Sequence, residues 1–115
     1  MPRRYDLEER TEQFAKRVRD FVKRLPKDLT NTEYARQLIR ASGSVGANYI
    51  EANEALSKKD FLMRVKISRK EAKESRYWLR LIVASDEHSR EQESVVQESK
   101  ELLMILSAIL RNAGK

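Results

Sequence analysis

Residues 42–61 read SGSVGANYIEANEALSKKDF, and this stretch decides the fold. Two of the chain's three glycines, Gly43 and Gly46, lie in it, although the residues around them repeat with helical spacing. Each glycine costs about 1 kcal/mol relative to alanine in the interior of a helix. A helix that continues through both glycines therefore needs a compensating contact. The alternative is a break or kink at SGSVG.

The second half of the stretch predicts a turn and the start of another helix. Ser57 is followed three residues later by Asp60, which resembles a capping box with Asp in place of the usual Glu. We expect this helix to end near Ser85 and to turn one face to the core. That face holds Phe61, Val65, Ser68, Ala72, Leu79 and Val83.

Three further apolar stripes, with spacings of three and four residues, predict three more helices. The first stripe ends before Pro26, and the second follows a cap at Thr30 or Asn31. The last stripe follows a capping-box pattern from Ser89 to Gln92. The stripes consist of Leu7, Thr11, Phe14, Val18, Phe21, Val22 and Leu25; of Tyr34, Leu38, Ala41, Val45, Tyr49, Ala52 and Leu56; and of Val95, Ser99, Leu102, Leu103, Leu106, Ile109 and Leu110.

The composition also favours an all-α fold. Of 115 residues, 40% are hydrophobic and 37% are charged, with only two prolines and three glycines. Sandwiches and barrels need many more turn residues. The connections between the predicted helices are short, and four such helices pack most simply as an antiparallel up-down bundle. We expect one domain, residues 1–115, because a chain of this size rarely builds a second core.

Several classes of protein are disfavoured by the sequence. The chain has no cysteine, which excludes disulfides and thiolate sites. Its start, MPRRYDLEERTEQF, lacks the apolar segment of a signal peptide, and no run approaches the length of about 20 apolar residues that spans a bilayer. We expect a cytoplasmic protein. The single histidine, His88, lies in a polar break, and no catalytic or metal-binding motif accompanies it. Catalytic residues, a metal and a cofactor are not expected, so the protein should not be an enzyme.

The second predicted helix has a second apolar face. At 100° per residue, this face lies roughly a third of a turn from the core stripe. It groups Ile39, Gly43, Gly46 and Ile50. Glycine removes the side chain that would hold two backbones apart. We predict that another helix packs closely here, either within the bundle or from another subunit.

The third predicted helix has a basic face. The net charge is +6, and residues 58–80 hold nine Lys or Arg against three acids, whereas residues 86–101 hold six acids. The cations within one arc of about 100° are Lys59, Lys66, Arg69, Lys73, Arg76 and Arg80, with Tyr77 among them. Such a line of cations can neutralise successive phosphates of a nucleic acid. The alternative is a solvated face, paired in part with Glu71, Glu74 or the acids that follow.

These stretches closely resemble a known family. The bacterial four-helix-bundle proteins encoded in intervening sequences of 23S ribosomal RNA genes contain segments similar to DLEERTEQFAKRVRDFVKRLP and QLIRASGSVGANYIEANEALSKKDFLMRVKISRKEAKESRYWLRLI. Their pattern joins R-x-x-x-S-I/V-x-x-N-x-x-E to S-x-K-D-F and E-x-x-E-x-x-x-W-L. The matching positions are Arg40, Ser44, Val45, Asn48, Glu51, Ser57, Lys59, Asp60, Phe61, Glu71, Glu74, Trp78 and Leu79.

The resemblance implies a ring-shaped homo-oligomer, often a homopentamer, with no established enzymatic activity and no settled cellular role. A related branch, the accessory variability determinants of diversity-generating retroelements, looks like the same bundle and binds nucleic acid and a reverse transcriptase through a basic surface. In such a ring, the face with Ile39, Gly43, Gly46 and Ile50 is expected at the subunit interface. A buried polar network that fixes the helix register is expected from Asn48, Glu51, Glu71 and Glu74.

Two functions therefore remain open. In the first, the protein is a non-catalytic oligomer that binds structured RNA, or an RNA–protein complex, through the basic face. In the second, it is a protein–protein interaction scaffold, and the basic face serves only solubility. An enzyme would need a metal or cofactor that the sequence does not announce.

Overall fold

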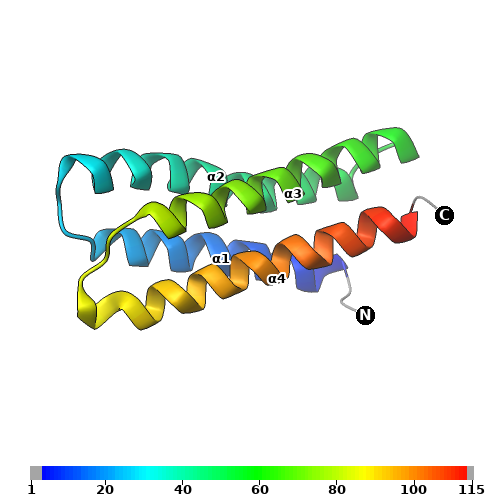
Figure 1. The fold of residues 1–115 in the computed structure, drawn as a ribbon. Helices are drawn as coiled ribbons and strands as arrows, with labels where there is room; N and C mark the ends of the chain where they lie inside the picture. Colours follow the sequence, from blue (N-terminus) through cyan, green and yellow to red (C-terminus); the bar gives the residue numbers. More distant parts are fainter. Residues whose placement is uncertain (1–3, 114–115) are drawn as a thin grey trace.

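The computed structural model describes residues 4–113, with side chains from Asp6 onward. Within this range the chain forms four long α-helices and no strand. The helices are α1 (Arg4–Lys23), α2 (Leu29–Asn53), α3 (Lys58–Leu81) and α4 (Ser89–Ala113), and a 3₁₀ turn, η1 (Asp86–His88), precedes α4. Figure 1 shows that consecutive helices run in opposite directions, as predicted for an up-down bundle.

Each helix packs against two neighbours. The helix α2 contacts α1 and α3, and α4 contacts α3 and α1, with the α1–α4 contact the least extensive of the four. Across the diagonals of the described bundle, no Cα atoms of α1 and α3, or of α2 and α4, come within 8 Å. The α1–α2 and α3–α4 connections lie at one end of the rod, and the α2–α3 connection lies at the other (Figure 1). One face of each helix is therefore left for solvent or for a partner.

The four predicted stripes form one core. Its largest fully buried side chains include Phe14 and Phe21 of α1, Leu38 of α2, Leu79 of α3 and Leu102 of α4. Burying one such side chain stabilises the fold by about 1.5–3 kcal/mol, so these contacts hold the bundle together.

Two predicted members of the stripes were wrong. Leu56 is 100% exposed, because α2 ends at Asn53 and the stripe does not continue past it. Val83 is also exposed, because α3 ends at Leu81 rather than near Ser85.

The cap of α2 differs from the prediction. Asp28, rather than Thr30 or Asn31, is the N-cap, and its carboxylate accepts a hydrogen bond of 2.8 Å from the Asn31 N–H. Asn31 is buried instead and connects two loops. Its side-chain amide donates to the carbonyls of Pro26 and Val83, and its side-chain oxygen accepts from the Val83 N–H. A residue that resembles a cap thus joins the α1–α2 connection to the end of α3.

Of the two predicted capping boxes, only the first caps a helix. The Ser57 hydroxyl accepts a hydrogen bond of 3.1 Å from the Asp60 N–H and opens α3. The prediction for Ser89 and Gln92 was wrong, because the Ser89 hydroxyl donates to the Asp86 carbonyl. The Gln92 amide donates 2.8 Å hydrogen bonds to the carbonyls of Leu79 and Ile82. Gln92 therefore satisfies carbonyls that the end of α3 leaves without helical partners.

The two glycines of α2 have different roles. The helix continues through SGSVG, so the alternative of a break there is wrong. Gly46 is buried, and a Cβ atom built on it would lie 2.8 Å from Oγ1 of Thr11 on α1. Gly43 is exposed, and a Cβ atom there would meet nothing within 4 Å. The close helix contact predicted for Gly46 therefore lies within the bundle, where contact with α1 offsets the cost of glycine.

Alanine substitutions at the two glycines should have opposite effects. Gly43→Ala should raise the free energy of unfolding by about 0.5–1 kcal/mol, because it removes backbone entropy from the unfolded chain at no steric cost. Gly46→Ala should lower it by about 1–3 kcal/mol, because the new methyl group must displace the buried Thr11. Urea unfolding measures both changes in the free energy of unfolding. It is carried out at a protein concentration at which all variants have the same native mass. Changes of the same sign would contradict this account of α2.

Candidate nucleic-acid interface

The predicted basic face lies along the outer side of α3. Lys66, Lys73 and Arg80 each follow a fully buried residue of the core stripe by one position, so the core contacts of α3 turn these cations outward. Lys59 is also exposed, whereas Arg69 and Arg76 are half-buried. All six predicted cations therefore reach the surface at least in part.

Four cations surround a groove between α3 and α4. Its volume is about 430 Å³. The lining residues are Lys66, Arg69, Lys70 and Lys73 from α3 and Leu103 and Ser107 from α4. Cations that line a concave surface reinforce one another's field, and this favours an anionic ligand. Lys70 was not among the predicted residues, although its spacing of four from Lys66 places it on the same side of the helix.

The cations of this face have no acidic partners within residues 6–113. None of the six predicted cations forms an ion pair there, and the Nε atom of Arg76 is buried without a hydrogen-bond partner. On α3, Nζ of Lys70 lies 3.3 Å from Oε2 of Glu74, which is an ion-pair distance. The same Glu74 oxygen is buried and accepts no hydrogen bond. The alternative was a solvated face paired in part with Glu71, Glu74 or the acids that follow. Of such pairs, the described residues form only the one between Lys70 and Glu74.

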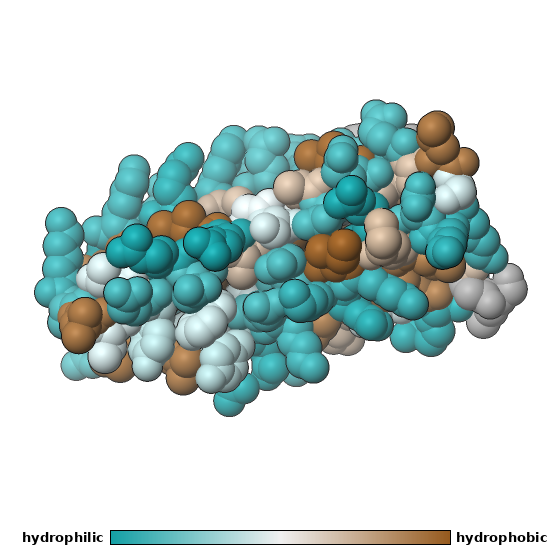
Figure 2. All heavy atoms as spheres, turned by 90° about the horizontal axis from the view of Figure 1, so that it is seen from above, coloured by the Kyte–Doolittle hydropathy of each residue, from teal (hydrophilic) through white to brown (hydrophobic). Residues whose placement is uncertain are grey.

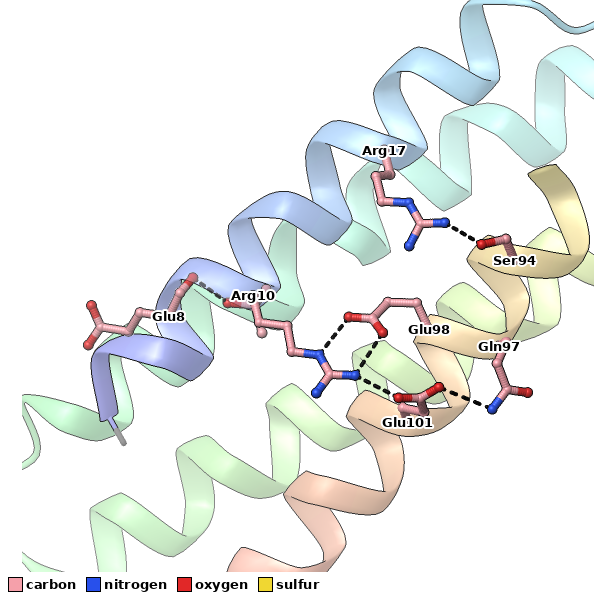
Figure 3. Close-up of polar contacts among 8 residues, drawn as sticks. Glu8, Arg10, Arg17, Ser94, Gln97, Glu98 and Glu101 are labelled. Carbon is pink, nitrogen blue, oxygen red and sulfur yellow. Dashed lines mark hydrogen bonds and ion pairs between the residues drawn. The ribbon is translucent and has the colours of Figure 1, made fainter. Parts of the chain in front are cut away.

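Three of the four acids of α4, which are Glu91, Glu98 and Glu101, bond on the α1 side of the bundle, whereas Glu93 lines the same groove as Arg80 of α3. Figure 3 shows Arg10 between Glu98 and Glu101, with nitrogen–oxygen distances of 2.8 Å to both carboxylates. Farther along the same seam, Arg17 donates to the Ser94 hydroxyl at 2.7 Å (Figure 3).

These contacts form a polar ladder between two antiparallel helices. A third contact, from Arg24 to Glu91, extends it, and the three arginines repeat every seven residues. The hydrogen bonds to Glu98 raise the pKa of Arg10 above its ordinary value, although burial opposes this. Hydrogen bonds from Gln97 and then Arg10 lower the pKa of Glu101. This ladder was not predicted from the sequence, although the seven-residue spacing of the arginines could have indicated it.

The predicted buried polar network does not form among the described residues. Asn48 donates to the Ser44 carbonyl at 2.9 Å and accepts from Arg64 at 3.3 Å, and Glu51 is exposed. Glu71 is half-buried, and desolvation, followed by repulsion from Glu74, raises its pKa. None of the four predicted members bonds to another, because Asn48 faces α3 through Arg64 while Glu51 turns to solvent.

The predicted oligomer face of α2 is only partly available. Ile39 is 51% exposed, Ile50 is 46% exposed, and Gly43 between them leaves open space beside the backbone. Gly46 is not on this surface, since it packs on Thr11 of the same chain. A groove of about 440 Å³ between α1 and α2 adjoins Ile39 and also contacts Val22 and Leu25. The lining of this groove comes from α1, α2 and the connection between them, and none of it from α3.

The described residues include neither a metal-binding cluster nor a helix that could span a membrane. Within the described range, no three His, Cys, Asp or Glu residues cluster in a way that could hold a metal ion. The helices in the same range are too polar or too short to cross a bilayer.

Comparison with known proteins identifies the family. Residues 3–108 match the family described as 23S rRNA-intervening sequence protein. The chain belongs to this family. No curated protein matches the chain. The resemblance inferred from the residue pattern is thus confirmed over nearly the whole sequence.

A solved structure supports both the family and the fold. It is a crystal structure of a protein with unknown function from the S23 ribosomal protein family of Bacteroides thetaiotaomicron. The present chain is 30% identical in sequence to the Bacteroides protein, and the two structures superpose with a TM-score of 0.75. The match covers 90% of this chain and 97% of the Bacteroides chain. The shared bundle therefore includes all four helices rather than one hairpin.

Replacing Arg10 should weaken the α1–α4 contact. Arg10→Met keeps much of the apolar stem but removes the hydrogen bonds to Glu98, which is more buried than Arg10 itself. We expect the free energy of unfolding to fall by about 1 kcal/mol, since partial exposure reduces the contribution of the ion pair. Thermal unfolding measures the change. Lys16→Met, which breaks the exposed pair with Glu12, is the control and should have little effect. Equal effects would show that the ladder contributes no special stability.

Proposed function

We propose that this 23S rRNA-intervening sequence protein is a non-catalytic module that binds structured RNA through the basic face of α3. The observation that supports the proposal is the separation of charge across the bundle. Three of the four acids of α4, which are Glu91, Glu98 and Glu101, bond to arginines of α1 or of its C-terminal end, whereas the six cations of the basic face have no ion-pair partner within residues 6–113. Unpaired surface cations favour a polyanion, because each phosphate that they neutralise releases condensed counterions.

The geometry of α3 suits a nucleic-acid backbone. From Lys59 to Arg80 the helix extends for about 32 Å at 1.5 Å per residue, long enough for its cations to contact several phosphates. The groove between α3 and α4 gathers three of these cations, Lys66, Arg69 and Lys73, together with Lys70 near the middle of this length. Since phosphate contacts carry no sequence information directly, we expect recognition by shape and charge rather than by base sequence.

We propose further that copies of the chain assemble through the outer face of α2. Two half-exposed isoleucines with Gly43 between them would let a neighbouring helix approach closely. Homopentamers are what the family resemblance implies. A ring would repeat the basic face in each subunit, and linked binding sites of modest affinity give a tight complex with one RNA.

Reversing charges on the basic face should abolish RNA binding. The variant carries Lys66→Glu, Arg69→Glu, Lys73→Glu and Arg80→Glu. We expect the affinity for a labelled hairpin RNA to fall steeply with salt in the wild type, and the variant to lose about one unit of salt slope per phosphate contact removed. Fluorescence anisotropy at several salt concentrations measures this, after circular dichroism has shown that the variant folds.

The matched control reverses the same number of cations elsewhere, all four of them exposed. It carries Lys23→Glu, Lys27→Glu, Arg40→Glu and Lys100→Glu. Both variants change the net charge from +6 by −8, to −2, so only the position of the charges differs. If both variants bind RNA as the wild type does, the proposal is wrong and the alternative, a protein–protein interaction scaffold, is favoured. Equal losses in both would show binding by net charge alone.

The assembly is tested separately from the RNA. Replacing Ile39 and Ile50 by glutamate should lower the native mass in light scattering without loss of helicity, because the charges would be buried against a neighbouring subunit. The control carries the same change to glutamate at Leu56 and Met104, which are exposed and lie outside this face. A native mass that is unchanged in the Ile39 and Ile50 variant, or a monomeric wild type, would exclude this interface.

A further inference from the structure

An exposed aromatic ring lies within the basic face of α3. The side chain of Tyr77 is 57% exposed, and it is the only aromatic residue among the exposed large hydrophobic side chains described. It follows Lys73 by four residues and precedes Arg80 by three, so both cations neighbour it on the helix surface. Tyr77 makes no hydrogen bond within residues 6–113. No hydrogen bond of the described bundle therefore depends on this ring.

Contact with a neighbouring aromatic ring restricts the position of the Tyr77 side chain. Tyr77 contacts Trp78 edge to face, with ring centroids 5.1 Å apart and an interplanar angle of 71°. Trp78 in turn contacts Tyr34 of α2, with centroids 6.0 Å apart. Aromatic pairs of this geometry stabilise one another beyond the area that they bury. Trp78 therefore supports Tyr77 from the side, while most of the Tyr77 ring remains open to solvent.

This combination matches the chemistry of proteins that bind unpaired nucleotides. In such proteins, cations hold the phosphates while bases stack on exposed aromatic rings. The bases of a continuous duplex are already stacked on their neighbours and offer their faces to no side chain. An aromatic ring within a line of cations therefore distinguishes unpaired from paired nucleotides, which cations alone cannot do.

We infer that Tyr77 is a stacking site for an unpaired base of RNA whose phosphates lie on Lys73, Arg76 and Arg80. This inference rests on the proposed function and adds to it a preference for RNA with unpaired nucleotides. The face of α3 then combines two kinds of contact: the groove near Lys66 and Lys70 attracts any phosphate backbone, and Tyr77 selects strands whose bases are free.

The test compares two RNA probes of equal charge. One is an unstructured RNA oligonucleotide, and the other is a blunt-ended RNA duplex with the same number of phosphates. Tyr77→Ala should bind the oligonucleotide roughly tenfold more weakly than the wild type and the duplex unchanged, because one stacking contact is lost. Tyr77→Phe keeps the ring and should behave as the wild type. Leu56→Ala, at an exposed apolar residue outside the basic face, is the matched control and should change neither affinity.

A spectroscopic readout follows the site directly. Trp78 is the only tryptophan of the chain, and its ring touches Tyr77. The oligonucleotide should therefore change tryptophan fluorescence in the wild type and in Tyr77→Phe. The same oligonucleotide should cause little change in Tyr77→Ala, even at concentrations that saturate binding.

Other outcomes separate this inference from the proposed function. If the charge-reversal variant loses both RNAs but Tyr77→Ala keeps the oligonucleotide, the stacking site is wrong and the basic interface stands. Equal weakening of both probes by Tyr77→Ala would also refute base stacking. A lower native mass in Tyr77→Ala would show instead that a second copy covers the ring. If the charge-reversal variant binds both probes as the wild type does, both proposals fail.

Discussion

The hydrogen bonds from Arg10 to Glu98 and Glu101 hold two of the acids of α4 against α1, on the side of α4 away from the basic face. The α1–α4 contact is the least extensive of the four helix contacts, and polar side chains extend it beyond the apolar core. A third acid of α4, Glu91, is paired with Arg24 at the end of α1. Acids held in this way do not neutralise α3, the other neighbour of α4, and the six cations of the basic face have no ion-pair partner within residues 6–113.

The surface bears on the two proposed roles, assembly and RNA binding. Figure 2 shows hydrophilic side chains over most of the face in view, with hydrophobic residues in small groups between them. The exposed Ile39 and Ile50 lie on α2, whereas the cations of the basic face lie on α3. Assembly and RNA binding would therefore use different helices. Each role can therefore be changed by substitution without direct damage to the other.

Most of the fold could be predicted from the sequence because apolar periodicity follows directly from helix geometry. The core positions Phe14, Leu38, Leu79 and Leu102 are examples. The helix ends were less predictable, since Asp28, Thr30 and Asn31 are all good caps and only tertiary contacts decide among them. The candidate site was partly predictable for the same reason. A helical wheel orders the cations of α3, but it cannot show which acids bond to another helix or that Gly46 faces Thr11.

The side chain of Asn31 has a consequence for how the bundle opens. Its hydrogen bonds join the α1–α2 connection to the α3–α4 connection at one end of the rod. At the far end, α1 begins and α4 finishes, and there the helices are linked covalently only between α2 and α3 (Figure 1). Local unfolding should therefore start at the far end and spread toward Asn31, so that amide exchange slows progressively along each helix.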